Sequence, residues 1–307
     1  MDQFSSHPLY RVHNIDTAMN SLWEFYRRNF LMLFAVSVVM SFAIQYVSSF
    51  INLNDLQSET DLTVILDKIK DLFVPLMIIS LVNLLFSTII QHYIIYKPID
   101  SQNTIFSSII KSLRYYIPYI IILILLSIFG GIAIVLGLVA LVVGALFAII
   151  YVMTLYLFIL PVMMVEGTDI GHVIRRVFSL AHRNFWMNFG WVATFIVIVL
   201  VISLVLSGII LLPFAGSFLK TIFGSENASA AADLTKSPLY IILSSLVNAL
   251  TIPLMPIFAA ILYFNGKARE EYREQDYQPD KQEERVRVED LYAKPYSDDH
   301  PDNPDRK

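Results

Sequence analysis

The chain has 307 residues, of which 56% are hydrophobic and 16% charged, with a formal net charge of −4 at pH 7. A mean hydropathy of +0.61 excludes a soluble domain with a single anchor and indicates a polytopic membrane protein. Because the chain has no cysteine, a disulfide framework, a thiolate metal site and a cysteine nucleophile are also excluded.

Six uncharged apolar runs predict an all-α membrane domain over residues 1–265. The longest run, 115–165, would make a helix about 77 Å long, so it must cross a hydrocarbon core of about 30 Å twice. We expect the turn within it at Gly137, with Gly130–Gly131 as the alternative, because glycine relaxes a helix most easily. The predicted spans are about 29–51, 72–96, 116–137, 139–164, 185–212 and 239–264.

Each odd-numbered span is preceded by a stretch whose apolar residues recur at helical spacing. Asn14, Asn103 and Thr168 are the expected N-caps of these stretches. The pattern predicts three copies of one repeat, a cytoplasmic amphipathic helix in the membrane interface followed by a transmembrane hairpin. The apolar stripes are Ile15, Ala18, Met19, Leu22 and Tyr26, then Ile105, Phe106, Ile109, Ile110 and Leu113, then Ile170, Val173, Ile174, Val177, Phe178 and Ala181.

Lysine and arginine set the predicted orientation. With the N-terminus inside, the inner segments before the tail carry nine of them, whereas the outer loops carry Lys68, Lys70, Lys220 and Lys236. The positive-inside rule then places both termini in the cytoplasm. The tail, residues 266–307, holds many charges and no apolar periodicity, so we expect it to be disordered, either inert or a docking segment for a protein partner.

The basic faces of the three amphipathic stretches are the candidate contacts for lipid headgroups or a partner, with the apolar faces in acyl chains. The alternative is that they are only anchors that set topology. Glu166 and Asp169 suit the positive end of the third helix. The candidate residues are Arg175, Arg176 and Arg183, and in the other repeats Arg27, Arg28, Lys111 and Arg114.

The predicted spans contain no Asp, Glu, Lys or Arg, which argues against an ion-coupled pump. Asn83 and Asn248 lie mid-span, where they either bond neighbouring helices or line a polar path. Pro253 and Pro256 should kink the last span. No metalloprotease, nucleotide-binding or serine-nucleophile motif is present. We therefore expect no enzyme activity, no catalytic or metal-binding residues, no cofactor and no nucleic-acid partner.

One region carries a family signature. Leu160-Pro161-Val162-Met163-Met164-Val165-Glu166-Gly167 leaves a span, and a helix containing Arg175-Arg176-Val177-Phe178-Ser179-Leu180 precedes Arg183-Asn184-Phe185-Trp186. Over about residues 158–191 this resembles the glycerophosphodiester phosphodiesterase membrane-domain family and related six-span bacterial proteins. The resemblance implies a multi-pass protein of the bacterial inner membrane. It implies no phosphodiesterase activity, because that family's catalytic barrel has no counterpart here.

The leading hypothesis is therefore a non-enzymatic inner-membrane protein with a scaffold, accessory or lipid-interacting role. The alternative is a permease or channel for a small uncharged or amphiphilic solute, using Asn83, Asn248 and the kink at Pro253 and Pro256.

Overall fold

A computed structural model gives the structure of the chain. It describes residues 3–49, 51, 62–100, 102–139, 141–215 and 237–276. The outer-loop residues Lys220 and Lys236 and the tail from 277 onward lie outside the described residues. Residues 1–268 form one compact unit and 269–307 another, and all packing below concerns the first.

The regular elements of the described residues are all helices. Six segments are long and apolar enough to cross a membrane, so the all-helical, six-span prediction is confirmed. The long helices are α1 (Ile15–Arg28), α2 (Phe30–Ser48), α4 (Leu62–Tyr96), α5 (Ile105–Val139), α6 (Leu141–Glu166), α7 (Ile170–Arg183), α8 (Phe185–Leu211), α11 (Pro238–Thr251) and α12 (Leu254–Asp276), with short 3-10 turns at Gln3–Ser6 and Leu212–Phe214.

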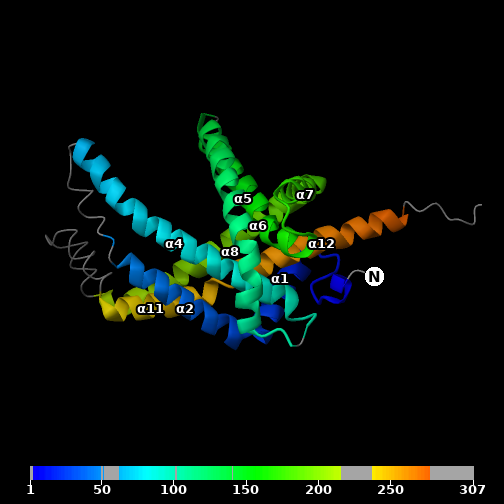
Figure 1. The fold of residues 1–307 in the computed structure, drawn as a ribbon, viewed down its shortest axis with the longest axis horizontal. Coiled ribbons are helices and arrows are strands. Elements are labelled where there is room, and N and C mark those ends of the chain that lie inside the picture. The colour runs from blue at the N-terminus through cyan, green and yellow to red at the C-terminus, as the bar shows by residue number, and fades with distance from the viewer. Residues whose placement is uncertain are drawn as a thin grey trace, which may run out of the picture. The chain divides into compact units, whose positions relative to one another are not determined.

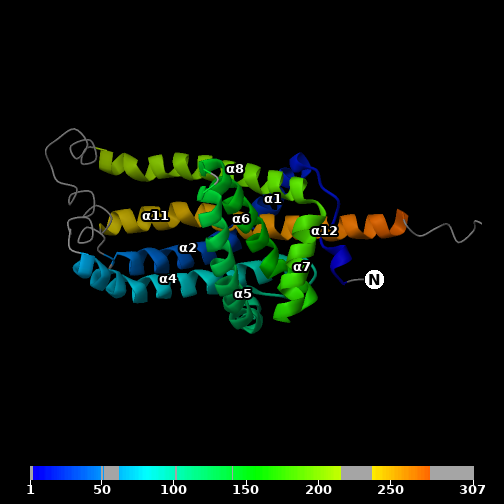
Figure 2. The ribbon, with the colours of Figure 1, turned by 90° about the horizontal axis from the view of Figure 1, so that it is seen from above.

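Four helices form a layer in the order α8, α11, α2, α4, and the α5–α6 pair packs across it. Figure 2 shows the four helices of this layer running side by side. In Figure 1 the α5–α6 pair rises away from α4. The helices therefore converge at one end and diverge at the other.

The apolar core occupies the converging end. Its fully buried residues come from the last turns of α4 and α6, the beginning of α8 and the middle of the sixth span, where every residue from Ile257 to Phe264 is at most 4% exposed. In contrast, large apolar side chains of the diverging end are open, such as Val139 at 82% and Val143 at 76%. An apolar surface of this kind is compatible with a hydrocarbon surrounding.

The turn between the third and fourth spans is not at Gly137, and that prediction was wrong. Helix α5 continues through Gly137 to Val139, and α6 begins at Leu141. A Cβ at Gly137 would lie 2.6 Å from the carbonyl oxygen of Gly144. This glycine is thus required because two helix backbones approach closely, and not because the chain turns there.

The three amphipathic stretches differ in their helix boundaries and in the burial of their apolar residues. Helices α1 and α7 are separate elements, whereas the middle stretch is continuous with its span in the 35-residue α5. In the stripes of α1 and α7, Ala18, Leu22, Val173 and Val177 are buried in the protein core. Most of each stripe therefore packs on the protein and not on acyl chains as expected, although Phe178 is 44% exposed. In α5, by contrast, Phe106 is 69% exposed.

The N-caps agree with expectation once in three cases. Asn14 caps α1, and its Oδ1 accepts a hydrogen bond of 2.8 Å from the Thr17 amide. In α5, Thr104 caps instead of Asn103, since its Oγ1 accepts from the Ser107 amide. In α7, Asp169 caps instead of Thr168, since its Oδ1 accepts from the His172 amide at 2.7 Å. The boundary errors are one residue each.

The sixth span is divided into α11 and α12. The helix stops after Thr251 and resumes at Leu254, so Pro253 lies in the break and Pro256 in the first turn of α12. Proline has no amide hydrogen to donate, so it kinks or breaks a helix. The helix breaks at Pro253, whereas Pro75, Pro118 and Pro161 lie inside the continuous helices α4, α5 and α6. The hydroxyl of Tyr26 donates to the Leu250 carbonyl at 3.0 Å, which satisfies an acceptor at the end of α11 and docks α1 there.

The N-terminal segment covers the converging end. The ring of His7 stacks on Phe264 with centroids 4.4 Å apart, and its Nε2 lies 3.2 Å from the Ile94 carbonyl. The His13 amide donates to Asn265 Oδ1 at 2.9 Å. The beginning of the chain is thereby joined to α4 and α12.

Candidate functional site

A cavity of about 830 Å³ lies among the six spans. Its walls come from α2, α4, α5, α6, α8 and the α11–α12 break, and they are mostly apolar. None of the described residues that line it carries a formal charge. Cavities of this size and composition are typical of sites for small molecules.

One polar stripe follows the wall formed by α4. Asn83, Ser87 and Gln91 are four residues apart, so they share one helix face, and all three line the cavity. Asn83 is exposed, Ser87 is half-buried and Gln91 is 1% exposed. Ser87 Oγ donates to Asn83 Oδ1 at 3.3 Å. The stripe therefore leads from the open part of the cavity to its buried end.

The Gln91 amide is the unusual member of this stripe. In the part of the chain that the structure describes, its Nε2 is buried and has no hydrogen-bond partner. Buried polar atoms in proteins nearly always have a partner. Nearby on the cavity wall, Tyr119 and Tyr156 join α5 to α6 through a hydrogen bond between their hydroxyls, so these phenols satisfy each other.

The cavity has an open and a closed side. Ser127 and Gly131 on α5 line it and are exposed, and a Cβ at Gly131 would meet no atom within 4 Å. We call this side the mouth. At the other side, Gln91, Tyr119 and Ala259 are all buried. An occupant would thus enter from the lipid-facing side and end against the converging core.

A second cavity of about 330 Å³ lies between α5, α6 and α7. It shares Leu126, Gly130 and Val152 with the first cavity. Its lining is almost entirely apolar, and Ile174 and Phe178 from the stripe of α7 close one side of it. This arrangement explains in part why the α7 stripe faces the protein.

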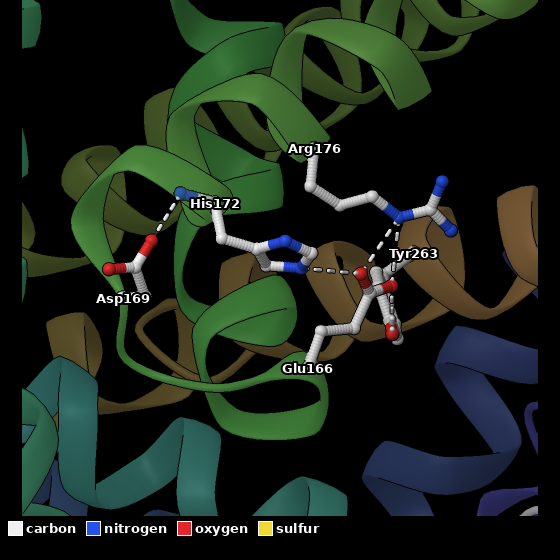
Figure 3. A network of polar contacts seen from close by, with 5 residues as sticks. All are labelled: Glu166, Asp169, His172, Arg176 and Tyr263. Atoms are coloured by element: carbon white, nitrogen blue, oxygen red, sulfur yellow. Dashed lines mark hydrogen bonds and ion pairs between the residues drawn. The ribbon is translucent and has the colours of Figure 1, made fainter.

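A polar network holds α6, α7 and α12 together at the converging end. In Figure 3 the side chains of His172, Arg176 and Tyr263 converge on Glu166. Arg176 Nε donates to both carboxylate oxygens at 2.8 and 3.0 Å, and the Tyr263 hydroxyl donates to Oε1 at 2.9 Å. His172 Nε2 lies 3.5 Å from Oε2. Glu166, the last residue of α6, thus accepts from side chains of both α7 and α12.

The predicted basic contacts fall into two groups. Arg176 is engaged by Glu166, and its side chain is only 20% exposed, so its Nε serves the fold. The side chains of the other six candidates are exposed, namely Arg175, Arg183, Arg27, Arg28, Lys111 and Arg114. Arg114 also donates to the Tyr115 hydroxyl and lies over that ring.

The candidate residues within the spans differ in whether they line the large cavity. Asn83 and Pro256 line the large cavity, whereas Asn248 is not among its lining residues. The carbonyl of Asn248 accepts from Thr251 Oγ1 at 3.0 Å, a bond within α11. Asn83 and Asn248 therefore do not share one polar path in this structure.

Sequence reasoning missed the role of Asn188. Its buried side-chain amide donates to the carbonyls of Leu180 and Ala181 at 3.0 and 3.2 Å. These carbonyls belong to the last turn of α7, which has no partners within its own helix. A polar residue inside an otherwise apolar run was the only available signal.

Within the described ranges, no cluster of histidine and acidic residues is arranged to hold a metal ion. No protein-family model, curated protein or solved structure matches this chain.

Proposed function

We propose that this chain is a non-enzymatic integral membrane protein with a lipid-interacting role, in which the large cavity binds a membrane amphiphile. The observation that carries the proposal is the cavity of about 830 Å³, enclosed by six apolar helices and open on the lipid-facing side. Apolar walls with a few polar groups suit a ligand that has both kinds of surface.

The proposal includes the finer features expected from the sequence. These are membership of the family that residues 158–191 resemble, a place in the bacterial inner membrane, cytoplasmic termini, three hairpins, basic faces of α1 and α7 at the membrane interface, and a tail that docks a partner. The exposed Arg175 and Arg183 support contact of α7 with anionic headgroups, because exposed basic residues near a membrane attract such lipids.

Orientation is testable directly because the chain has no cysteine. Single cysteines at Ser179 and Lys70 would be exposed to a thiol reagent that does not cross the membrane. We expect Lys70→Cys to react in intact cells and Ser179→Cys only after the membrane is permeabilised. The reverse pattern would contradict cytoplasmic termini.

Blocking the mouth tests lipid binding. Gly131→Leu places a side chain in open space at the mouth, where no atom lies within 4 Å of the new Cβ. We expect the purified variant to retain less lipid than the wild type after mild delipidation, as measured by native mass spectrometry. Gly208→Leu is the matched control, since Gly208 has equally open surroundings and does not line the cavity. Equal lipid retention in both variants would contradict the proposal.

The second candidate is a permease or channel for a small uncharged or amphiphilic solute. It is favoured by the stripe of Asn83, Ser87 and Gln91, since a polar path along one wall is what a passing solute requires. Uptake into proteoliposomes should then fall in Asn83→Leu and remain in Asn248→Leu, because only Asn83 lines the cavity. Absence of uptake by the wild type would remove this candidate.

A further inference from the structure

We propose that the occupant of the large cavity is a neutral amphiphile whose uncharged head accepts a hydrogen bond from the Gln91 amide at the closed end, with its acyl chains leaving by the mouth. This inference rests on the proposed function and specifies its ligand class. A diacylglycerol has the required chemistry, because its ester carbonyls are acceptors and it carries no charge.

The buried side-chain amide of Gln91 favours a ligand that carries a hydrogen-bond acceptor. Gln91 is 1% exposed, and its Nε2 lacks a partner among the described residues. Leaving a buried donor unsatisfied is unfavourable, and water is poorly supplied in so apolar a pocket. A rotation of the Gln91 side-chain amide would bring Nε2 to the cavity wall, where a ligand oxygen would satisfy it. The closed end therefore suits a ligand that carries an acceptor.

The uncharged lining of the cavity favours an uncharged head. The lining residues include Asn83, Ser87 and Gln91 but no acidic, basic or histidine side chain among those described. A phosphate buried at the closed end would have no counter-charge, and an unpaired buried charge is strongly unfavourable. The arginines suited to anionic headgroups, such as Arg175 and Arg183, are on the exposed face of α7. An uncharged head is therefore favoured in the cavity.

The depth of Gln91 within α4 also suits the head of a membrane lipid. Gln91 precedes the end of α4 at Tyr96 by five residues, which corresponds to about 8 Å along the helix. A head bound there lies near the level at which the converging ends of the helices meet the membrane interface. Chains that run from Gln91 past Ser87 to the mouth then point toward the bilayer centre, as they do in an ordinary lipid leaflet.

The test uses full-length protein in lipid nanodiscs with two photoactivatable probes, a diacylglycerol and a phosphatidylglycerol, each carrying a diazirine within one acyl chain. We expect the diacylglycerol probe to label peptides that line the cavity, such as those containing Ser127 or Val152. Unlabelled diacylglycerol should compete with this labelling at concentrations at which phosphatidylglycerol does not.

Gln91→Leu removes the donor with little change in volume and should reduce labelling by the diacylglycerol probe about tenfold, the effect of one lost hydrogen bond. Gln45→Leu is the matched control on α2, because Gln45 does not line the cavity, and its labelling should equal that of the wild type. The competition experiment uses only wild-type protein, so it stands even if Gln91→Leu folds poorly.

The outcomes distinguish the proposal that the cavity binds lipid from the inference that the bound head is uncharged. If phosphatidylglycerol labels and competes in the cavity as well as diacylglycerol does, the inference about the head is wrong while the cavity remains a lipid site. The same conclusion follows if a folded Gln91→Leu variant is labelled like the wild type. If neither probe labels cavity peptides in the wild type, the proposed function itself fails.

Discussion

Replacing Glu166 with glutamine should lower the free energy of unfolding by about 2 kcal/mol, because Glu166 at the end of α6 accepts hydrogen bonds from both α7 and α12. Its carboxylate accepts from Arg176 Nε at 2.8 Å and from the Tyr263 hydroxyl at 2.9 Å. The side chains of the ion pair are only 14% and 20% exposed. Glutamine preserves the shape of Glu166 and removes its charge.

The magnitude follows from the bonds that change. A hydrogen bond to a charged group contributes about 1.5–3 kcal/mol and a neutral one about 0.5–1.5 kcal/mol, so the bond from Tyr263 loses about 1 kcal/mol. The bond from Arg176 keeps the charge of the guanidinium but loses the opposite charge of the carboxylate, which we count as about 1 kcal/mol. The two losses sum to about 2 kcal/mol. For a chain of 307 residues the change corresponds to a decrease in Tm of roughly 3 °C. Tyr263→Phe removes the whole bond to the Glu166 carboxylate and should cost about as much, roughly 1.5–3 kcal/mol.

Thermal unfolding in lipid nanodiscs, followed by the fluorescence of the three tryptophans, measures the effect. A double-mutant cycle with Arg176→Gln isolates the pair, since residues in contact show coupling beyond the sum of the single effects. The matched control is Asp67→Asn. Asp67 pairs with Lys70 at 2.7 Å, but both side chains are about three-quarters exposed, so Tm should stay within experimental error.

Two results would refute this reasoning. One is a Glu166→Gln variant that unfolds at the same temperature as Asp67→Asn. The other is an additive double mutant, in which the effects of Glu166→Gln and Arg176→Gln simply sum. The first would mean that the network in Figure 3 does not stabilise the fold. The second would mean that Glu166 and Arg176 do not stabilise it as a pair.

Three further predictions concern the packing of the helices. Asn188→Leu removes two hydrogen bonds to the last turn of α7 and should increase amide hydrogen exchange in 178–183, as measured by mass spectrometry. Gly137→Ala places a Cβ 2.6 Å from the Gly144 carbonyl oxygen and should destabilise the protein by about 1–3 kcal/mol, whereas Gly131→Ala, in open space, should leave Tm nearly unchanged. Burial lowers the pKa of His7 from 6.5 to about 4, and its Nδ1 accepts from the Leu9 amide, so the neutral ring is the form that packs. The unfolded state then binds more protons between pH 6.5 and 4, and stability falls as the pH falls through that window. Proteolysis of the N-terminal segment should accelerate over this range in the wild type and much less in His7→Gln.

The six spans could be predicted because uncharged runs of sufficient length have one physical interpretation in a protein this apolar. The ends of the separate helices α1 and α7 could also be predicted from the sequence. Each is followed by an asparagine, Asn29 or Asn184, whose backbone leaves the helical region with ψ of 15° and 52° respectively. At the corresponding place in the middle repeat stands Tyr115, which continues the helix, so the second amphipathic stretch merges with its span.

The cavity and the network were beyond sequence reasoning because they depend on how distant helices meet. Glu166 and Arg176 are ten residues apart across a helix boundary, and Tyr263 is 97 residues from Glu166. Helical periodicity relates residues on one helix only. The glycine at 137 has two physical uses, a turn or a close approach, and only the position of Gly144 decides between them.

The burial of the last span has a consequence for biogenesis. Residues 257–264 occupy the centre of the converging core, and Asn265 bonds to His13 across 252 positions of the chain. During synthesis the first five spans enter the membrane before their common partner has left the ribosome, so their buried faces must wait in lipid or against the insertion machinery. Assembly is therefore completed in one late step. A chain released before residue 254 lacks the segment that fills the core, and we expect membrane proteases to degrade it.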